Sequence, residues 1–213
     1  TCMRKLIILS FFISFLSKIN AQQCPFEKSN GTESATYFEA IEWYKDLDKA
    51  STQVLVKEMG MTDAGYPLHL VLVSNDGKFD AAQWHKQNKA VILINNGIHP
   101  GEPDGIDASM MLVRDIVAKK VTLPKNVVLA FIPVYNIGGC LNRSVNYRID
   151  QNGPLEKGFR GNSQNLDLNR DFIKCDSKDA RAFTEIFHLT DPDVLVDNHV
   201  SNGADYQHVM TLL

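Results

Sequence analysis

A tetrapeptide, His99-Pro100-Gly101-Glu102, lies between a predicted buried strand and a predicted amphipathic helix, and this order constrains the fold more than any other feature. Residues 90–94 form an apolar run rich in β-branched residues, which favours a strand, and residues 95–97 (Asn-Asn-Gly) are typical of a turn. Beyond the tetrapeptide, Asp104 is expected to cap a helix whose apolar residues recur at helical spacing up to residue 120. The tetrapeptide is therefore expected at the carboxyl end of a strand, where open α/β sheets place their ligands.

Hydrophobic periodicity predicts further strands and helices around this unit. We expect helices over residues 36–50 and 178–189 and strands over residues 53–61, 68–73, 126–134, 194–197 and 206–213. The turn-rich link between the first two strands suits a hairpin, and the strand, helix, strand order from residue 90 to residue 134 suggests a parallel crossover. Residues 136–171 lack clear apolar periodicity, and loops of that length are usually functional or disordered. The pattern predicts one α/β domain.

The first 21 residues have the pattern of a signal peptide. Met3-Arg4-Lys5 gives a basic start, residues 6–16 are apolar, and Ile19-Asn20-Ala21 resembles a cleavage site. We therefore expect a secreted protein, periplasmic or extracellular, without a membrane span after cleavage. An N-terminal membrane helix is the alternative, but the apolar run falls short of the ~20 residues that a span needs.

Export would change both the charge and the redox setting of the chain. Residues 1–21 contain three basic and no acidic residues, so their removal lowers the formal net charge from −3 to −6, and nucleic acid is not an expected partner. Cys24, Cys140 and Cys175 would meet an oxidising compartment. A bridge between Cys140 and Cys175 would close the long loop between them, but each of the three can equally be a free buried thiol.

A second histidine repeats the placement of the first. His199 follows the predicted strand at 194–197 and precedes the polar turn Ser201-Asn202-Gly203. Two histidines and one glutamate from neighbouring strand ends match the arrangement of catalytic zinc, which takes three protein ligands and one water. His99, Glu102 and His199 are the predicted ligands of one zinc ion.

The long polar segment offers groups that bind a carboxylate or an oxyanion. Asn169 and Arg170 follow alternating apolar residues, and an arginine fork with an adjacent amide can hold a carboxylate. Upstream, Arg160 and Arg148 each place a permanent charge in the same segment, where it can stabilise an oxyanion. For each arginine taken singly, a surface ion pair with a nearby acidic residue is an equally good interpretation.

The remaining histidines, His69, His85, His188 and His208, are expected to be structural or solvated. The sequence has no Gly-x-Ser-x-Gly elbow and no Walker loop, so serine hydrolase and nucleotide-dependent functions have no support.

Taken in order, the motif at residues 99–102, the segment Asp167-Leu168-Asn169-Arg170 and then His199 resemble the zinc carboxypeptidase A-like family. The resemblance covers about residues 53–213 and implies an α/β/α sandwich with a central mixed sheet, of the carboxypeptidase/aminopeptidase-like type. It implies that His99, Glu102 and His199 bind one zinc ion, and that Asn169 and Arg170 hold the C-terminal carboxylate of a peptide or protein substrate.

By the same resemblance one arginine polarises the scissile carbonyl. Arg160 stands nine residues before Asn169, a spacing similar to that of cytosolic-type members, whereas Arg148 beside Tyr147 resembles the aromatic-arginine pair of the digestive type. We favour Arg160 and keep Arg148 as the alternative. Digestive members often carry an arginine where this chain has Gly101, so the resemblance does not imply extended-substrate contacts of that kind.

The resemblance also implies that the chain is a fragment. The family's general-base glutamate and substrate-capping tyrosine lie downstream of the last zinc histidine, beyond Leu213, so the chain by itself is expected to be inactive. We expect a signal peptide over residues 3–21, an N-terminal segment with a helix over 22–52, and a partial catalytic domain over 53–213, truncated at the C-terminus. The expected protein is a monomer.

Two other functions remain open at this point. A zinc amide deacylase of the aspartoacylase and succinylglutamate desuccinylase type shares the plan of His-x-x-Glu and a later histidine, and small acidic acyl groups would also suit Arg170. A non-catalytic module that binds peptide ends would retain the fold and the metal without turnover.

Overall fold

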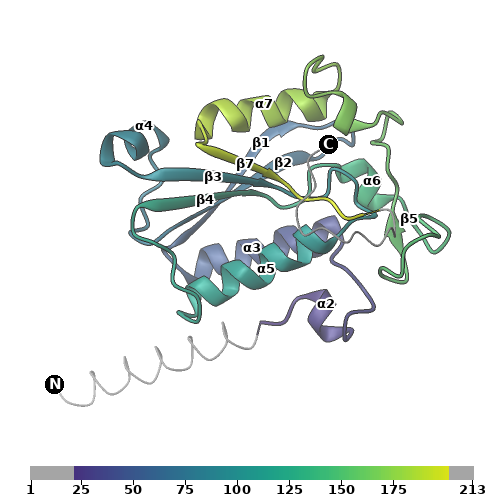
Figure 1. The fold of residues 1–213 in the computed structure, drawn as a ribbon, viewed down its shortest axis with the longest axis horizontal. Helices are drawn as coiled ribbons and strands as arrows, with labels where there is room; N and C mark the ends of the chain where they lie inside the picture. Colours follow the sequence, from purple (N-terminus) through teal and green to yellow (C-terminus); the bar gives the residue numbers. More distant parts are fainter. Residues whose placement is uncertain (1–21, 202–213) are drawn as a thin grey trace.

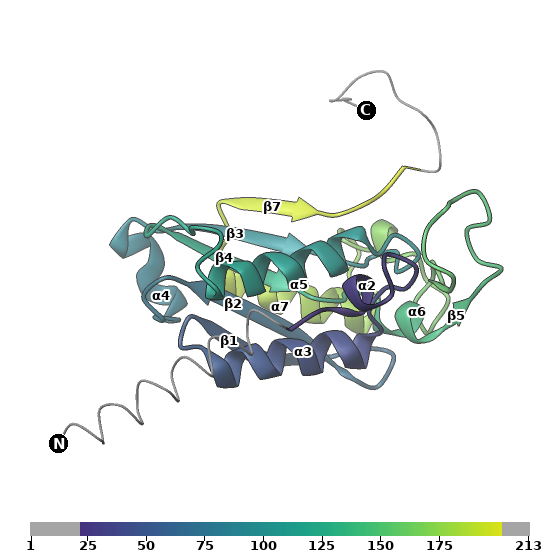
Figure 2. The ribbon, with the colours of Figure 1, turned by 90° about the horizontal axis from the view of Figure 1, so that it is seen from below.

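The computed structural model describes residues 22–201, which form a central sheet between two layers of helices (Figures 1 and 2). The sheet has the order β1-β2-β4-β3-β7 among these residues. Its strands are β1 (Val54–Met61), β2 (Pro67–Ser74), β3 (Ala90–Asn95), β4 (Val127–Ile132) and β7 (Val194–Asp197). The signal-peptide prediction and the strand predicted at 206–213 lie outside the described residues.

The sheet is mixed, as the resemblance implied. β1 and β2 form the predicted antiparallel hairpin, and β2 is antiparallel to β4. β3 lies between two parallel neighbours, β4 and β7, so that Asn95 is paired with both Ile132 and Asp197. The connection from β3 to β4 through a helix confirms the parallel crossover.

Helices cover both faces of the sheet. α3 (Tyr37–Ala50) and α5 (Asp104–Val117) lie on one face and α7 (Lys178–Thr190) lies on the other (Figure 1). Thr36 caps α3 in a box with Glu39, and the Ser177 hydroxyl accepts from the Ala180 N–H at the start of α7. The predicted cap of α5 is wrong, because Asp104 is its first helical residue, follows Pro103 and makes no capping bond.

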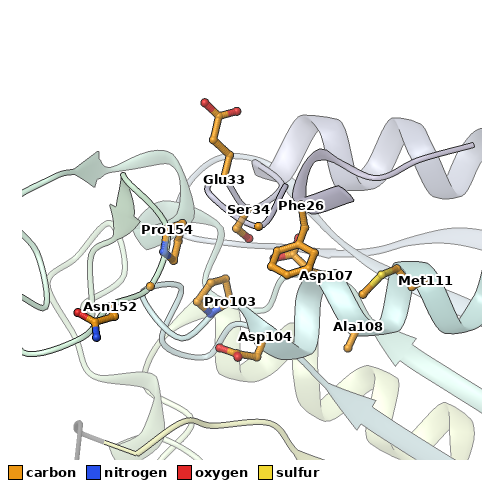
Figure 3. A pocket seen from close by; sticks show the side chains of 12 residues that line it. Phe26, Glu33, Ser34, Pro103, Asp104, Asp107, Ala108, Met111, Asn152 and Pro154 are labelled. Carbon is orange, nitrogen blue, oxygen red and sulfur yellow. The ribbon is translucent and has the colours of Figure 1, made fainter. Parts of the chain in front are cut away.

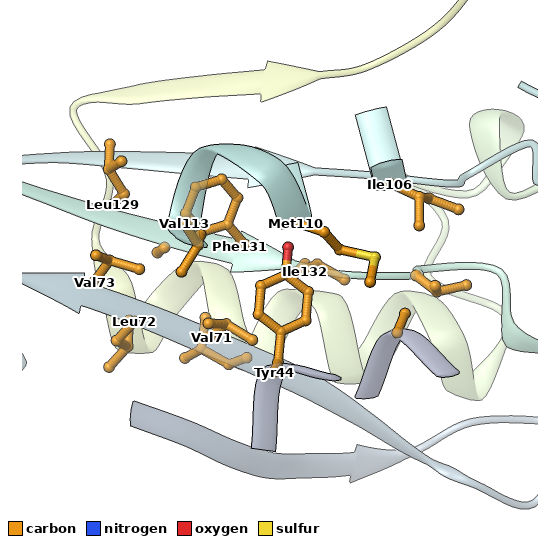
Figure 4. Close-up of a cluster of buried hydrophobic side chains, with 14 of the residues drawn as sticks. Tyr44, Val71, Leu72, Val73, Ile106, Met110, Val113, Leu129, Phe131 and Ile132 are labelled. Atoms are coloured by element: carbon orange, nitrogen blue, oxygen red, sulfur yellow. The ribbon is translucent and has the colours of Figure 1, made fainter. Parts of the chain in front are cut away.

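The hydrophobic core includes Phe183 and Ile186 of α7 on one face of the sheet, and its other part lies between the sheet and the α3–α5 layer (Figure 4). Tyr44 of α3, Met110 of α5 and Phe131 of β4 are fully buried there, and Phe131 is paired in register with Val71 of β2. Burying one side chain of this size contributes about 1.5–3 kcal/mol to stability. Because Tyr44 and Leu47 belong to this core, residues 22–52 pack with the sheet instead of forming a separate body.

Short elements complete the described chain. They are α2 (Pro25–Lys28), α4 (Ala81–Trp84), η1 (His85–Gln87), α6 (Ile137–Leu141), β5 (Arg143–Ser144), β6 (Lys157–Gly158) and η2 (Leu168–Arg170). The last four organise the polar segment at 136–171, where β5 and β6 pair with each other. Among residues 22–201, none of the helices has the length and apolar character that crossing a membrane requires.

The cysteines of the described chain are free thiols. Cys24 and Cys140 are buried and Cys175 is half-buried, so the structure does not form the bridge considered between Cys140 and Cys175. Burial raises the pKa of the Cys140 thiol to about 11, which keeps it protonated and unreactive near neutral pH.

Candidate metal centre

The parallel strands β3 and β7 bring two histidines to the same edge of the sheet. Asn95 and Asp197, the last residues of these strands, are paired in register, and the chain continues from them to His99 and His199. Gly97, on the way to His99, has a φ of +66°, and a Cβ added there would lie 3.0 Å from the Ile106 side chain. The strand register therefore brings together residues that are far apart in the sequence.

His99, Glu102 and His199 form one group, with a donor atom of each within 4.8 Å of the others. Nδ1 of His99 lies 3.3 Å from Oε1 of Glu102, and Nδ1 of His199 lies 3.0 Å from Oε2 of the same carboxylate. His99 and Glu102 are almost fully buried, whereas the side chain of His199 is 33% exposed. The carboxylate thus lies between two imidazoles at a site that solvent reaches from one side.

The donor atoms of this group suit a cation. The Nδ1 atom of His99 is buried and makes no hydrogen bond. Imidazole nitrogen and carboxylate oxygen are common zinc ligands, and three protein ligands with an open fourth position are typical of catalytic zinc. The residues present therefore fit the metal that the sequence predicts.

Each of the two imidazoles also contacts a second carboxylate, through its Nε2 atom. Nε2 of His99 donates to Oδ1 of Asp167 at 3.0 Å, and Nε2 of His199 donates to Oδ2 of Asp197 at 2.9 Å. Carboxylates in this position orient metal-binding histidines and leave the other ring nitrogen free for the metal. Neither aspartate was predicted to have this role, although Asp197 lies two residues before His199 and Asp167 lies two residues before Asn169.

Glu102 is held in its ionised form. Burial opposes ionisation, but contact with His99, a hydrogen bond from the Val200 N–H at 3.1 Å and the charge of Arg148 outweigh it and lower the pKa of Glu102 to about 2. The structure thus provides a negative charge between the two histidines.

Arg160 is linked to His99 through the carboxylate of Asp167. Its Nε donates to Oδ2 of Asp167 at 3.0 Å, while Oδ1 of Asp167 accepts from His99. Asn136, which is fully buried, fixes the backbone here, because its Nδ2 donates to the carbonyls of Arg160 and Ile98. The guanidinium remains 44% exposed and close to the group.

Arg148, the alternative arginine, contacts the group directly. Its Nη1 lies 2.7 Å from Oε1 of Glu102, so it pairs with this buried carboxylate instead of a surface acid. Gly101 permits this approach, because a Cβ there would lie 2.4 Å from Cδ of Arg148 and 2.9 Å from the Gly158 carbonyl oxygen.

Asn169 and Arg170 lie next to the group without touching it. Both belong to η2, which Asp167 caps by accepting from the Asn169 N–H at 3.0 Å. Arg170 is exposed, and its Nη1 donates to the Asn169 carbonyl. One aspartate therefore links the two predicted carboxylate-binding residues to His99.

The other described histidines lie outside this group. His69 is buried in β2, where its Nδ1 contacts the Tyr37 hydroxyl at 3.3 Å and the Pro67 carbonyl at 3.1 Å. His85 is exposed and contacts Asp191. His188 lies in α7, and His208 is outside the described residues.

A cavity of about 380 Å³ lies away from the candidate metal group, between the segment after α2 and the start of α5 (Figure 3). Pro103, Asp107, Met111 and Ser34 are among its lining residues, whereas none of the three predicted ligands is. Burial raises the pKa of Asp107 to about 6, and its Oδ1 accepts from the Ala35 N–H at 3.2 Å. The buried carboxyl of Asp107 thus has a bond of its own to the backbone.

The chain was compared with known proteins. A family model described as zinc carboxypeptidase matches residues 40–192. A metallo-carboxypeptidase from Burkholderia cenocepacia is 22% identical, with a TM-score of 0.60 over 81% of this chain and 43% of that one. Carboxypeptidase A from Helicoverpa armigera is 17% identical, with a TM-score of 0.54 over 79% of this chain and 46% of that one.

The chain therefore spans less than half the length of these two structures, which support the fold alone. The search of curated proteins gave no significant match. The family model covers most of the chain and includes His99, Glu102 and the Asn169-Arg170 pair, while His199 follows its end. On that match, together with the α/β/α fold, the chain belongs to the zinc carboxypeptidase family.

Proposed function

We propose that this chain forms the metal-binding part of a secreted, zinc-dependent metallocarboxypeptidase that hydrolyses C-terminal peptide bonds. The observation that carries the proposal is the meeting of His99, Glu102 and His199 at the end of two parallel strands, with a donor atom of each within 4.8 Å of the others. Family membership supports the same metal and the same class of substrate.

In this proposal His99 and His199 bind one zinc ion through Nδ1, and Glu102 binds it through its carboxylate. When bound, zinc in such a site polarises a carbonyl and lowers the pKa of its bound water. Asp167 keeps the proton of the His99 imidazole on Nε2, because its carboxylate accepts from that atom.

Arg160 is the proposed partner of the oxyanion that forms on the scissile carbonyl. Its guanidinium is partly exposed beside the group and is oriented by Asp167, so it has donors left to offer. Arg148 is less suited in this structure, because its Nη1 already contacts Glu102.

Asn169 and Arg170 are the proposed anchors for the C-terminal carboxylate of the substrate. The exposed guanidinium of Arg170 and the neighbouring amide can together hold a carboxylate through several hydrogen bonds. Because both lie in η2, which Asp167 caps, the anchored end would lie beside the metal group. This arrangement would confine cleavage to chain ends.

Secretion is proposed on the pattern of residues 3–21 alone, and a monomer is the proposed state. Both are checked by expressing the gene with its leader, sequencing the N-terminus of the exported product and measuring its mass in solution. A product that begins near Gln22 and sediments as one chain is the expected result.

The enzymatic part is tested with the complete reading frame that contains this chain. The protein is incubated with a peptide that has a free C-terminus and with the same peptide as its C-terminal amide, each with and without a chelator. We expect single C-terminal residues to be released only from the peptide with a free C-terminus, and only when metal is present. Internal cleavage, or equal cleavage of the amide, would overturn the exopeptidase proposal, and loss of a small N-acyl group would favour a deacylase.

A further inference from the structure

Asp197 is the last residue of β7, and its two carboxylate oxygens have different partners. Oδ1 accepts a hydrogen bond from Nδ2 of Asn95 at 2.9 Å. Oδ2 accepts from Nε2 of His199 at 2.9 Å. Each oxygen therefore serves one donor, and the carboxylate joins the end of β3 to the imidazole of His199.

The direction of this carboxylate is fixed by the neighbouring strand. Asn95 is fully buried and is paired with Asp197 in the parallel ladder. The next residues repeat the contact, because Nδ2 of Asn198 donates to Oδ1 of Asn96 at 2.7 Å and its N–H donates to the Asn95 carbonyl at 3.0 Å. Asn96 is held in turn by α5, through a bond from its Nδ2 to the Ser109 hydroxyl at 3.0 Å.

This network determines the state of the imidazole. A carboxylate accepts hydrogen bonds only, so the contact with Asp197 requires a proton on Nε2 of His199. The other ring nitrogen, Nδ1, lies 3.0 Å from Oε2 of Glu102, which is also an acceptor. A metal ion bound through Nδ1 would replace that contact, while the proton on Nε2 stays with Asp197. Asp197 also lies at the far nitrogen of the ring, away from the His99, Glu102 and His199 group, so it is not a fourth ligand.

We infer that Asp197, held by Asn95, is a positioning residue that keeps His199 in the ring orientation and tautomer needed to bind the metal. This inference rests on the proposed zinc site and adds a role to a residue outside its three ligands. Loss of such an outer carboxylate typically weakens metal binding by about 10–100-fold.

The sharpest variant is Asp197→Asn, which keeps the size of the side chain. Asn95 and His199 both donate to Asp197, but an asparagine has only one oxygen to accept with. Either Asn95 loses its acceptor, or the new NH₂ group faces Nε2 and favours the tautomer with the proton on Nδ1. We expect Asp197→Asn to bind zinc at least about ten-fold more weakly than the parent chain, and Asp197→Ala to do the same.

Asp191→Asn is the matched control. It removes the same charge six positions earlier in the sequence, at the exposed end of α7, where Asp191 has a left-handed backbone that asparagine tolerates. Zinc affinity is measured for the parent chain and the three variants by competition with a chromophoric chelator, and the metal-free proteins are compared by thermal unfolding. The control should bind zinc like the parent chain.

A second readout separates positioning from a merely structural role. Nitrogen NMR of the zinc-loaded parent chain should show a slowly exchanging proton on Nε2 of His199, and Asp197→Asn should lose it. Parent-like zinc affinity in a folded Asp197→Asn chain, or an unchanged Nε2 proton, would overturn the inference and leave the proposed function standing. A parent chain without zinc affinity would instead overturn the proposed function itself.

Discussion

Nε2 of His99 donates a hydrogen bond to Oδ1 of Asp167 at 3.0 Å, across 68 positions of sequence. The other oxygen of Asp167 accepts from Nε of Arg160 at 3.0 Å. The residue just before η2 thus connects a predicted metal ligand with the arginine proposed to face the substrate.

Replacing Asp167 should weaken zinc binding without unfolding the chain. Asp167→Ala removes the acceptor that orients His99, and we expect zinc affinity to fall by about 10–100-fold in a chelator competition. Asp176→Asn, at an exposed position where the carboxylate pairs with Lys174, is the charge-matched control and should leave the affinity unchanged. Equal affinities in the two variants would show that Asp167 does not orient the ligand.

Asp107 should make the chain less stable as the pH rises from 4 to 7. Burial raises its pKa from 3.8 to about 6, so the folded state retains a proton that the unfolded state has already released, and stability is lost as the pH rises through 6. A shift of this size corresponds to about 3 kcal/mol. Asp107→Asn keeps an acceptor for the Ala35 N–H. It should remove the part of the pH-dependent decrease in the free energy of unfolding that Asp107 causes.

The measurement is urea unfolding at pH 4.5 and pH 7, comparing the difference in free energy of unfolding between variant and parent. Asp179, whose pKa burial also raises to about 6, contributes with the same sign, so the dependence should shrink and not vanish. Asp150→Asn, at an exposed position outside α5, is the control. An identical pH dependence in Asp107→Asn and the parent would contradict the assignment.

The ion pair between Asp76 and Lys89 should stabilise the fold above about pH 4. Lys89 Nζ donates to both oxygens of Asp76 at 2.8 and 2.7 Å, which lowers the pKa of Asp76 to about 2, and the Lys89 side chain is only 6% exposed. Asp76→Ala leaves this ammonium without its carboxylate. We expect a loss of about 2 kcal/mol at neutral pH, between the values for surface and buried pairs, because Asp76 itself is 38% exposed.

The matched control for this pair is Asp46→Ala, which breaks the exposed Lys49–Asp46 pair of α3. Such pairs contribute at most about 0.5 kcal/mol. Since the pKa of Asp76 is lowered in the folded state, its contribution should disappear as the pH falls toward 2. Urea unfolding at neutral pH that gave the same small loss for both variants would contradict the prediction.

Gly101→Ala should disturb the contact between Arg148 and Glu102. The added Cβ would collide with Cδ of Arg148 and with the Gly158 carbonyl, so the segment at 148–158 has to move. We expect a loss of about 1–3 kcal/mol in the free energy of unfolding. Gly153→Ala, whose Cβ meets only the Lys157 side chain at 3.6 Å, should cost much less, and an equal cost would argue against this packing.

Local sequence patterns predicted the elements that have their own periodicity. The strand before His99, the hairpin and the helices α3 and α7 follow from apolar spacing, and they lie within one or two residues of the predicted bounds. α5 ends at Val117, three residues before its predicted end at residue 120. The cap at Asp104 was wrong because Pro103 directly precedes it and the helix starts at Asp104 itself.

The candidate site was only partly predictable. The tetrapeptide and His199 stood out because both follow short apolar runs, and the parallel register explains why these positions meet. The expectation that the strand before His199 is buried was wrong, because β7 lies at the edge of the described sheet and Val194, Leu195 and Val196 are exposed. The contacts of Asp167 with His99 and of Arg148 with Glu102 depend on how the polar segment at 136–171 folds. That segment has no apolar periodicity, so no local pattern indicates which of its charges reach the site.

The most direct test of the account is a crystal structure of the zinc-loaded chain with anomalous scattering measured at the zinc edge. We predict one peak, about 2.0–2.1 Å from Nδ1 of both His99 and His199 and bonded to the Glu102 carboxylate, with Nε2 of each ring still on Asp167 or Asp197. No peak at this position, or zinc bound through Nε2 of either histidine, would contradict the account.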